Sequence, residues 1–157
     1  MKTAKSLQCV VLLATGASLS AVVQADNCSG YDVLSLQSAE TFELAKGHTL
    51  TVVRLQSTNI SDDTASPYHL TTGECSGTVL STPDGNTRGA GFCTRKDKSG
   101  DAYNVEWQLP AGSKKFLWKH VGGTGKFSGT SDFGSAQGLE LAAGAKMNVN
   151  KWSGTCK

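Results

Sequence analysis

The feature that most restricts the fold of this 157-residue sequence is a pair of cysteines placed symmetrically about a turn. The segment Pro83–Asn86 reads Pro-Asp-Gly-Asn, and proline, aspartate and glycine each favour a tight turn. A hairpin centred on Asp84 and Gly85 sets Cys75 opposite Cys93. Opposed residues in a non-hydrogen-bonded antiparallel pair lie about 4.5 Å apart at Cα, which is within reach of a disulfide. The sequence therefore predicts a hairpin closed by a Cys75–Cys93 bridge.

The first 25 residues have the three-part layout of a secretory signal peptide. Two lysines give a positive start, residues 9–23 are apolar or small, and Val-Gln-Ala at 23–25 suits the positions before a cleavage site. A transmembrane anchor is the alternative. A span needs about 20 predominantly apolar residues, and this stretch is shorter and diluted by Thr, Gly and Ser. We expect residues 1–25 to be removed, which leaves residues 26–157 as a single domain in the periplasm or the secreted fraction.

Cleavage would make the number of cysteines even, because Cys9 leaves with the signal segment. Four cysteines in an exported protein usually form two disulfides. Once Cys75 is paired with Cys93, Cys28 and Cys156 pair by elimination and join the two ends of the domain. A zinc site would need cysteines two to four residues apart. The sequence has no such pair, so no metal is expected.

The charge argues against nucleic acid as a partner. The formal net charge of +2 disappears when the two lysines of the signal segment are removed. Capture of nucleic acid would need basic residues clustered on one face. The pairs Arg95–Lys96 and Lys114–Lys115 are isolated, and we expect both at solvated strand or turn positions. No later stretch is long and apolar enough for a helical span, so no membrane anchor is expected after signal cleavage.

The expected domain is a series of short apolar segments separated by turns, with no convincing helical period. The expected segments are Asp32–Leu36, Thr41–Ala45, His48–Gln56, Tyr68–Leu70, Cys75–Thr82, Arg88–Cys93, Ala102–Leu109, Lys114–Val121, Lys126–Phe133, Gly138–Ala143 and Lys146–Trp152. Strands at this spacing predict an all-β domain, either a closed antiparallel barrel or a β-sandwich. The 18 glycines fit the bends and close approaches of strongly coiled sheets.

Two neighbouring strands define one apolar face. Large residues alternate with polar ones along both, and a turn at Pro110–Ser113 sets the strands side by side. The residues that share this face are Tyr103, Val105, Trp107, Phe116, Trp118 and His120. Lys115 and Lys119 occupy the opposite face, which we therefore expect to be solvated. If the apolar face lines a barrel interior, the candidate ligand-binding residues are His120, Trp118, Trp107 and Tyr103.

Three runs of sequence resemble a group of small exported bacterial proteins of unassigned function. They are the turn-containing run Gly91–Asp101, the Trp-bearing strand Val105–Trp107, and the segment Trp118–Gly129 with its Gly-Gly-Thr-Gly-Lys-Phe turn. These proteins are similar to the allene oxide cyclase-like class, so the resemblance implies an eight-stranded barrel. It covers about residues 70–143. Its motifs are turns and core aromatics, so it carries over no catalytic residue, and Thr130–Gly134 departs from the Gly-Ser-Gly usual there.

The motifs that would indicate a cofactor or a metal are incomplete in this sequence. Gly122–Lys126 resembles a phosphate loop but lacks the G-x4-G-K-[ST] spacing that cradles phosphate and Mg²⁺. Asp97–Asp101 resembles a calcium loop, but Ala102 and Gln108 stand where an EF-hand needs Gly and Glu. The three histidines have no zinc spacing, and no G-x-S-x-G elbow is present. No cofactor is expected, and the catalytic residues, if any, are unknown.

Two function classes remain open. The first is a non-catalytic barrel that binds a small apolar ligand or a partner surface, because eight-stranded barrels can hold one small ligand. The alternative is a small isomerase or cyclase acting in the barrel cavity, with His120 and Glu106 as its polar groups. An interior cavity that holds a convergent polar pair would favour the enzyme. The sequence fixes neither the enzymatic status nor the oligomeric state.

Overall fold

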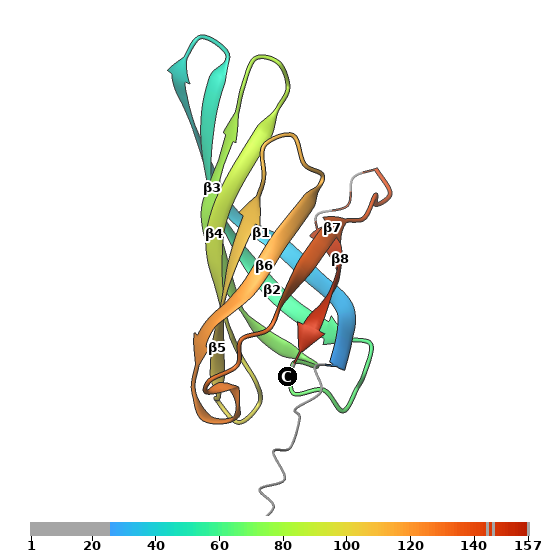
Figure 1. Cartoon of the computed structure of the whole chain (residues 1–157). Coiled ribbons are helices and arrows are strands. Elements are labelled where there is room, and N and C mark those ends of the chain that lie inside the picture. Colours follow the sequence, from blue (N-terminus) through green and yellow to red (C-terminus); the bar gives the residue numbers. More distant parts are fainter. Residues whose placement is uncertain (1–25, 144, 146, 157) are drawn as a thin grey trace, which may run out of the picture.

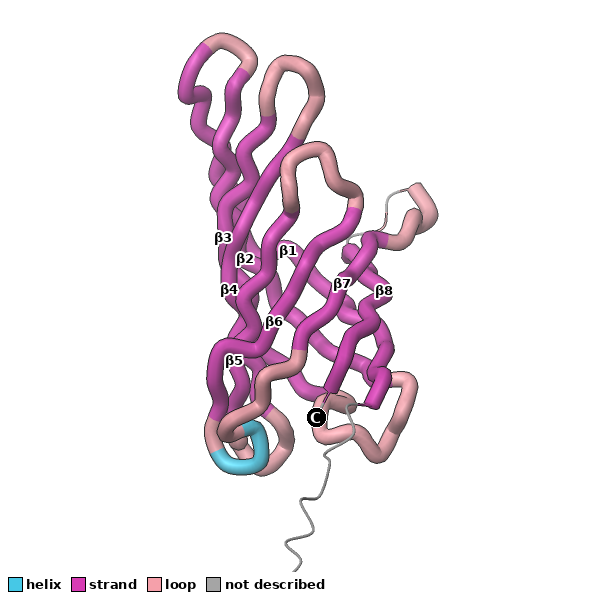
Figure 2. The backbone as a smooth tube through the Cα atoms, viewed as in Figure 1, coloured by secondary structure: helices cyan, strands magenta, loops and turns pink. Residues whose placement is uncertain are grey.

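The structure is a computed structural model that describes residues 26–143, 145 and 147–156, so the expected signal peptide lies outside the described residues. It is a closed barrel of eight antiparallel strands (Figures 1 and 2). The strands are β1 (Asp26–Ala45), β2 (His48–Ser61), β3 (Thr71–Ser81), β4 (Thr87–Lys96), β5 (Ala102–Leu109), β6 (Lys115–Gly123), β7 (Phe133–Gly138) and β8 (Met147–Cys156). A short 3₁₀ helix, η1 (Gly125–Phe127), follows β6. The barrel prediction is confirmed over the sandwich.

Each strand pairs with its neighbours in the chain, and β8 returns to pair with β1. The two ends of the barrel therefore carry different connections. The hairpins β1–β2, β3–β4 and β5–β6 lie at one end, at the top of Figure 1. The loops β2–β3, β4–β5 and β6–β7 lie at the other, with η1 among them. We call these the hairpin end and the loop end.

Both predicted disulfides are confirmed. Cys75 stands opposite Cys93 in the register between β3 and β4, and the two are bonded. The turn between these strands is the expected one, with Gly85 at a φ of 80° that glycine adopts without strain. Cys28 and Cys156 join β1 to β8, close to the point where the barrel is closed.

The first strand is longer than expected. The segments Asp32–Leu36 and Thr41–Ala45 belong to one strand, β1, which pairs with β2 along almost its full length. The register shifts by one residue between Leu36 and Ser38. Such a bulge bends a strand without ending it, so the polar residues there do not mark a turn.

The segment between β2 and β3 is a loop, and the strand expected at Tyr68–Leu70 is wrong. Turn hydrogen bonds join the His69 N–H to the Ser66 carbonyl and the Thr71 N–H to the Tyr68 carbonyl. Leu70 has a φ of 57°, a left-handed value that interrupts any extended run. Tyr68 is buried because its ring packs among other aromatic rings, not because it belongs to a strand.

The region before β8 also differs from the expectation. β7 covers Phe133–Gly138, whereas the sequence favoured Lys126–Phe133 and Gly138–Ala143. Gly125 and Gly129 have positive φ and turn the chain around η1, so the first of these segments cannot stay extended. The strand that forms is made largely of small residues, which pair well but give little hydropathy signal.

The predicted faces of β5 and β6 are confirmed. Trp107 pairs with Trp118 and Val105 with His120, and their side chains face the barrel interior. The intervening residues of β6 are exposed, among them Lys115 and Lys119, whose charges indicated it. One expectation about these strands is wrong: Glu106 points outward and pairs with Lys119 at 2.8 Å, because period-two alternation places it opposite Val105 and Trp107.

Candidate functional site

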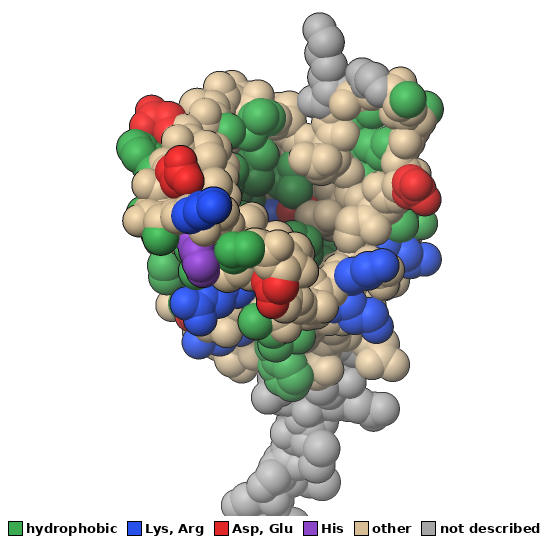
Figure 3. All heavy atoms as spheres, turned by 90° about the horizontal axis from the view of Figure 1, so that it is seen from above, with side chains coloured by type: hydrophobic (Ala, Val, Ile, Leu, Met, Phe, Trp, Pro, Cys, Tyr) green, Lys and Arg blue, Asp and Glu red, His purple; other side chains and the backbone are tan. Residues whose placement is uncertain are grey.

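A cavity of about 480 Å³ occupies the barrel interior. Seen from above, the barrel is hollow at its hairpin end and hydrophobic side chains line the hollow (Figure 3). Aliphatic residues that line it include Leu34, Leu36, Val53, Leu55, Val79, Val105 and Leu139. Every strand contributes at least one residue to the lining. A volume of this size is typical of small-molecule sites.

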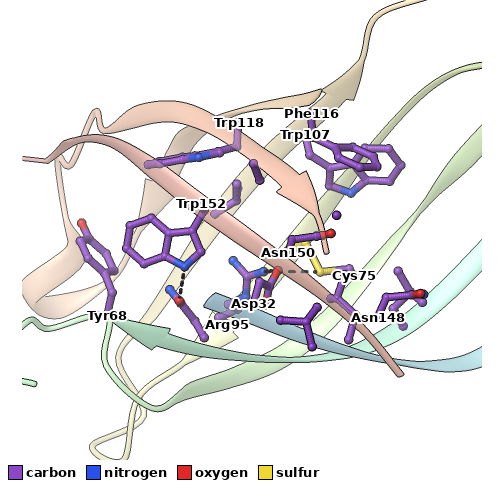
Figure 4. Close-up of a pocket in the computed structure, with 18 of the residues that line it drawn as sticks. Asp32, Tyr68, Cys75, Arg95, Trp107, Phe116, Trp118, Asn148, Asn150 and Trp152 are labelled. Atoms are coloured by element: carbon purple, nitrogen blue, oxygen red, sulfur yellow. Dashed lines mark hydrogen bonds and ion pairs between the residues drawn. A yellow bond between two sulfur atoms is a disulfide. The ribbon is translucent and has the colours of Figure 1, made fainter. Parts of the chain in front are cut away.

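All three tryptophans of the chain line this cavity, from β5, β6 and β8 (Figure 4). The indole N–H of Trp152 donates to Asn59 Oδ1 at 2.8 Å, which holds that ring across the interior. The indole nitrogen of Trp118 is buried and has no hydrogen-bond partner among the described residues. Phe116 packs edge-on against Trp107. The wall is therefore strongly aromatic, with one unsatisfied donor.

A buried ion pair lies in the same cavity. Arg95 Nη2 donates to Asp32 Oδ2 at 2.5 Å, and its Nε donates to Ser57 Oγ at 2.7 Å. Ser57 in turn donates to Asp32 Oδ1 at 2.6 Å, so the three side chains satisfy one another. The side chain of Arg95 is only 8% exposed, which makes the expected solvated position wrong. Arg95 stands two residues beyond Cys93 on β4, and this period-two spacing is the signal that could have placed it inside.

A second polar cluster closes the loop end. The Tyr68 hydroxyl donates to Asp132 Oδ2, and both groups are buried. His120 Nδ1 lies 3.3 Å from Asp132 Oδ2 and 3.4 Å from the Tyr68 hydroxyl. Burial, and then the hydrogen bond to Asp132, raise the pKa of Tyr68 well above its usual value. Tyr68 therefore stays a hydrogen-bond donor through the whole physiological range of pH.

The predicted ligand-binding residues all reach the cavity. Trp107, Trp118 and His120 line it, and Tyr103 lies at its base with its hydroxyl 2.7 Å from Thr71 Oγ1. The sequence did not reveal the polar partners of these residues. Those it missed are Asp32, Ser57, Asn59, Tyr68 and Asp132, which lie on other strands or in loops.

The loop Asp97–Asp101 is a structural turn in the described chain. Asp97 accepts hydrogen bonds from Ser99 and from the Asp101 N–H, and it pairs with Lys126 of η1. The Lys126 ammonium and Ser99 hold the pKa of Asp97 well below its usual range. This carboxylate therefore has a counter-ion within the chain. Among the described residues, no group of three His, Cys, Asp or Glu is placed to hold a metal ion.

The arrangement suits binding of a compact, mostly apolar molecule. The lining is aromatic and aliphatic, the two ionised groups inside it neutralise each other, and hydroxyl and imidazole groups stand at the base. The base also offers an acid–base pair, His120 and Tyr68, to a bound molecule. No helix in the described part of the chain is long and apolar enough to cross a membrane.

The barrel is similar to two solved structures. The pterocarpan synthase dirigent protein GePTS1 matches over 91% of this chain and 98% of its own, with a TM-score of 0.51 at 14% identity. Pyocyanin demethylase matches over 82% of this chain and 99% of its own, with a TM-score of 0.50 at 12% identity. At these identities the likeness shows the fold alone.

No protein-family model matches the sequence, and no curated protein matches it. The barrel that the sequence resemblance implied is thus confirmed as a fold, with a dirigent protein and a demethylase as structural neighbours. Bacterial origin and export stay predictions. The two disulfides fit an oxidising compartment.

Proposed function

We propose that this barrel binds one small, mostly apolar ligand in its interior, without chemistry. The observation that carries the proposal is the cavity of about 480 Å³ whose wall includes all three tryptophans of the chain. A barrel needed only as a scaffold would gain stability by filling this space with side chains. The structural neighbours support the proposal only in showing that barrels of this fold occur among proteins named for small-molecule chemistry.

We further propose that the ligand is met outside the cytoplasm, in the periplasm or the medium. The signal-like segment motivates this, and the disulfides, which persist in oxidising compartments, support it. N-terminal sequencing of exported protein should begin at Asp26. An intact Met1 on a membrane-bound product would contradict it.

The test combines two measurements on exported, oxidised protein. Native mass spectrometry should find a co-purified small molecule or an empty barrel that takes up one neutral apolar probe, N-phenyl-1-naphthylamine. Probe fluorescence should then rise on titration. Val53→Trp adds bulk to the cavity wall and should weaken probe binding several-fold, because Val53 lines the cavity.

Val52→Trp is the matched control, because Val52 is the next residue on β2 and faces outward. Its affinity for the probe should equal that of the parent protein. Absence of any saturable probe binding would reject the proposal. Equal affinities in the two variants would place the bound probe outside the cavity.

The second candidate is an isomerase or cyclase that acts in the same cavity, and one specific observation favours it. His120 faces the cavity and makes its contacts to Tyr68 and Asp132 through Nδ1. The other ring nitrogen would then meet the ligand, with Asp132 orienting the ring and Tyr68 as the second member of the acid–base pair. Glu106 takes no part, because it lies on the outside of the barrel.

His120→Gln separates the two candidates, with His69→Gln as control because His69 lies in the loop outside the cavity lining. A binding protein should convert the co-purified ligand in no form, and His120→Gln should at most weaken its affinity for that ligand, while His69→Gln leaves the affinity unchanged. An enzyme should lose conversion of that ligand in His120→Gln alone, with its thermal midpoint little changed. Conversion that survives His120→Gln would exclude a role for this residue in chemistry.

A further inference from the structure

One row of residues around the barrel has a symmetric composition. It follows the hydrogen-bonding direction across six consecutive strands, from β3 to β8, with each member directly paired with the next. Two tryptophans stand at its centre and two glycines flank them on either side. In order, the row is Gly77, Gly91, Trp107, Trp118, Gly134 and Gly154.

The glycines let both indoles lie against the wall of the barrel. A Cβ on Gly77 would lie 2.3 Å from Cζ2 of Trp107, and one on Gly91 would lie 2.5 Å from the same atom. Gly89, two residues before Gly91, would bring a Cβ within 3.5 Å of Cζ3. Gly77 and Gly91 are paired across two strands and Gly89 lies further along β4, so the ring extends over three positions that are not in line. A larger side chain at Gly77 or Gly91 would collide with the ring.

Trp118 leans the opposite way and repeats the arrangement. A Cβ on Gly134 or Gly154 would lie 2.7 Å or 2.5 Å from Cζ2 of this ring. The two indoles thus point away from each other. Trp107 covers the paired glycines of β3 and β4, and Trp118 covers those of β7 and β8. Trp152 also lies over a paired glycine, since a Cβ on Gly30 would lie 2.7 Å from its Cζ2. It differs in standing nearly perpendicular to Trp118 and in donating to Asn59 across the interior.

The consequence is a cavity whose wall shows aromatic faces rather than edges. An indole lying on glycine backbone fills little of the interior. Both rings line the cavity, where Trp107 also contacts Phe116 and Trp118 also contacts Trp152. Glycine weakens a strand, but at all four positions a Cβ would lie 2.0–2.5 Å from a carbonyl oxygen of the paired strand, so the close strand approach as well as the indoles requires glycine there. Flat aromatic faces are the preferred stacking partners of other flat π-systems.

We infer that the ligand of this barrel is a flat, fused-ring aromatic molecule that stacks on the indole faces of Trp107 and Trp118. The inference rests on the proposed function, since it names the chemical class of the same ligand. A flexible aliphatic chain would gain from burial alone and would leave the π-faces unused. The flat ring gains from both burial and stacking.

Three hydroxyl compounds with equal numbers of heavy atoms test the class: the phenol 2-naphthol and the alcohols decahydro-2-naphthol and 1-decanol. All carry one hydroxyl, and only the first is flat and aromatic. The two saturated alcohols are the more apolar, so burial alone would favour them. By calorimetric titration, 2-naphthol should bind at least about tenfold more tightly than either. Equal or tighter binding of the saturated alcohols would overturn the ligand class and leave the proposed function standing. Binding of none would overturn both.

Variants show which residues cause the preference for the aromatic compound. Trp107→Leu and Trp118→Leu keep an apolar side chain and remove the aromatic face, so each should lower the affinity for 2-naphthol several-fold and change that for 1-decanol much less. Trp118→Phe, which keeps a smaller face, should recover part of the loss. Phe92→Leu is the control, because Phe92 is exposed on the outer surface of β4. Circular dichroism and thermal midpoints identify any variant that fails to fold. A loss for 1-decanol equal to that for 2-naphthol would contradict stacking.

Discussion

The two ends of the barrel are built on different principles. Along β2 and β4 the inward residues become more buried toward the loop end. The inward residues of β5 are most buried at the start of the strand, which lies at the same end. Tyr103 and Phe127, both there, are almost completely inaccessible. At the hairpin end the strands continue past the packed core, and Phe42 and Leu44 of β1 are about half exposed. The loop end is filled by packed side chains, whereas at the hairpin end the strands surround the cavity.

This difference shows where stability and binding reside. Buried contacts at the loop end, and the ion pair between Asp32 and Arg95, hold the strands in register. Because that end closes the sheet, the hairpin end can remain hollow without loss of the fold. Four predictions test this difference between the ends by removing a disulfide, an ion pair, an aromatic ring or a hydrogen bond.

The largest effect is expected from removing the bridge between the chain ends. Cys28→Ala with Cys156→Ala opens a link that spans 128 residues, for which the chain-entropy account gives about 5 kcal/mol of unfolding free energy. Cys75→Ala with Cys93→Ala opens a link of 18 residues and should cost about 3 kcal/mol. Urea unfolding of the oxidised proteins measures both. A greater loss from the shorter link would show that closure at the ends matters less than the hairpin within the wall.

The next largest loss of unfolding free energy is expected from breaking the interior ion pair. Arg95→Met leaves the Asp32 carboxylate buried without its cation and should cost about 3–5 kcal/mol. Arg54→Met, the control, breaks the exposed pair with Glu74 and should cost no more than about 1 kcal/mol. The double variant Asp32→Leu and Arg95→Met removes both charges and should regain much of the loss. Similar costs for the two single variants would mean that the interior is as well solvated as the surface.

A somewhat smaller cost is expected for the tryptophan at the boundary between packed core and cavity. Trp118→Ala should destabilise by about 3 kcal/mol, the low end for a large aromatic, because one side of its ring borders empty space. Leu117→Ala, the next residue on β6, is exposed and should change the unfolding free energy by less than about 0.5 kcal/mol. An unchanged thermal midpoint in Trp118→Ala would show that the ring does not support the wall.

Much of this fold could be predicted from local sequence. The turn at Pro83–Asn86 set the register of β3 and β4, and with it the pairing of Cys75 with Cys93. Alternation along β5 and β6 gave their inward faces, because period two fixes the face once charged residues mark the outside. β7 was not predicted, because four of its six residues are glycine, serine or alanine and give no apolar alternation.

The candidate site was harder to predict, because its polar half is assembled from distant segments. His120 was found through its own strand, but its partner Tyr68 comes from the β2–β3 loop. Arg95 was mistaken for a solvated residue, because a cation inside a barrel is stable only if an anion reaches it, and Asp32 stands on another strand altogether. Nothing in the local sequence around Arg95 reveals that partner.

The smallest of the four effects tests the polar cluster that seals the loop end. Tyr68→Phe removes the hydroxyl that donates to Asp132 and should cost about 1–2 kcal/mol at neutral pH. The ring itself stays, so its packing against Phe127 and Tyr103 is kept. Chemical denaturation of both proteins measures the difference.

The pH dependence of that difference has a definite sign. The pKa of Tyr68 is raised in the folded protein, while in the unfolded chain it is about 10. Below that pH both states keep the proton and the hydrogen bond contributes in full. Above it the unfolded chain releases a proton that the folded protein retains, so stability falls as pH rises. The advantage of the parent protein over Tyr68→Phe should therefore shrink between about pH 9 and about pH 11. A constant or growing advantage would mean that the Tyr68 hydroxyl is not held by Asp132, and that the loop end is closed by ring packing alone.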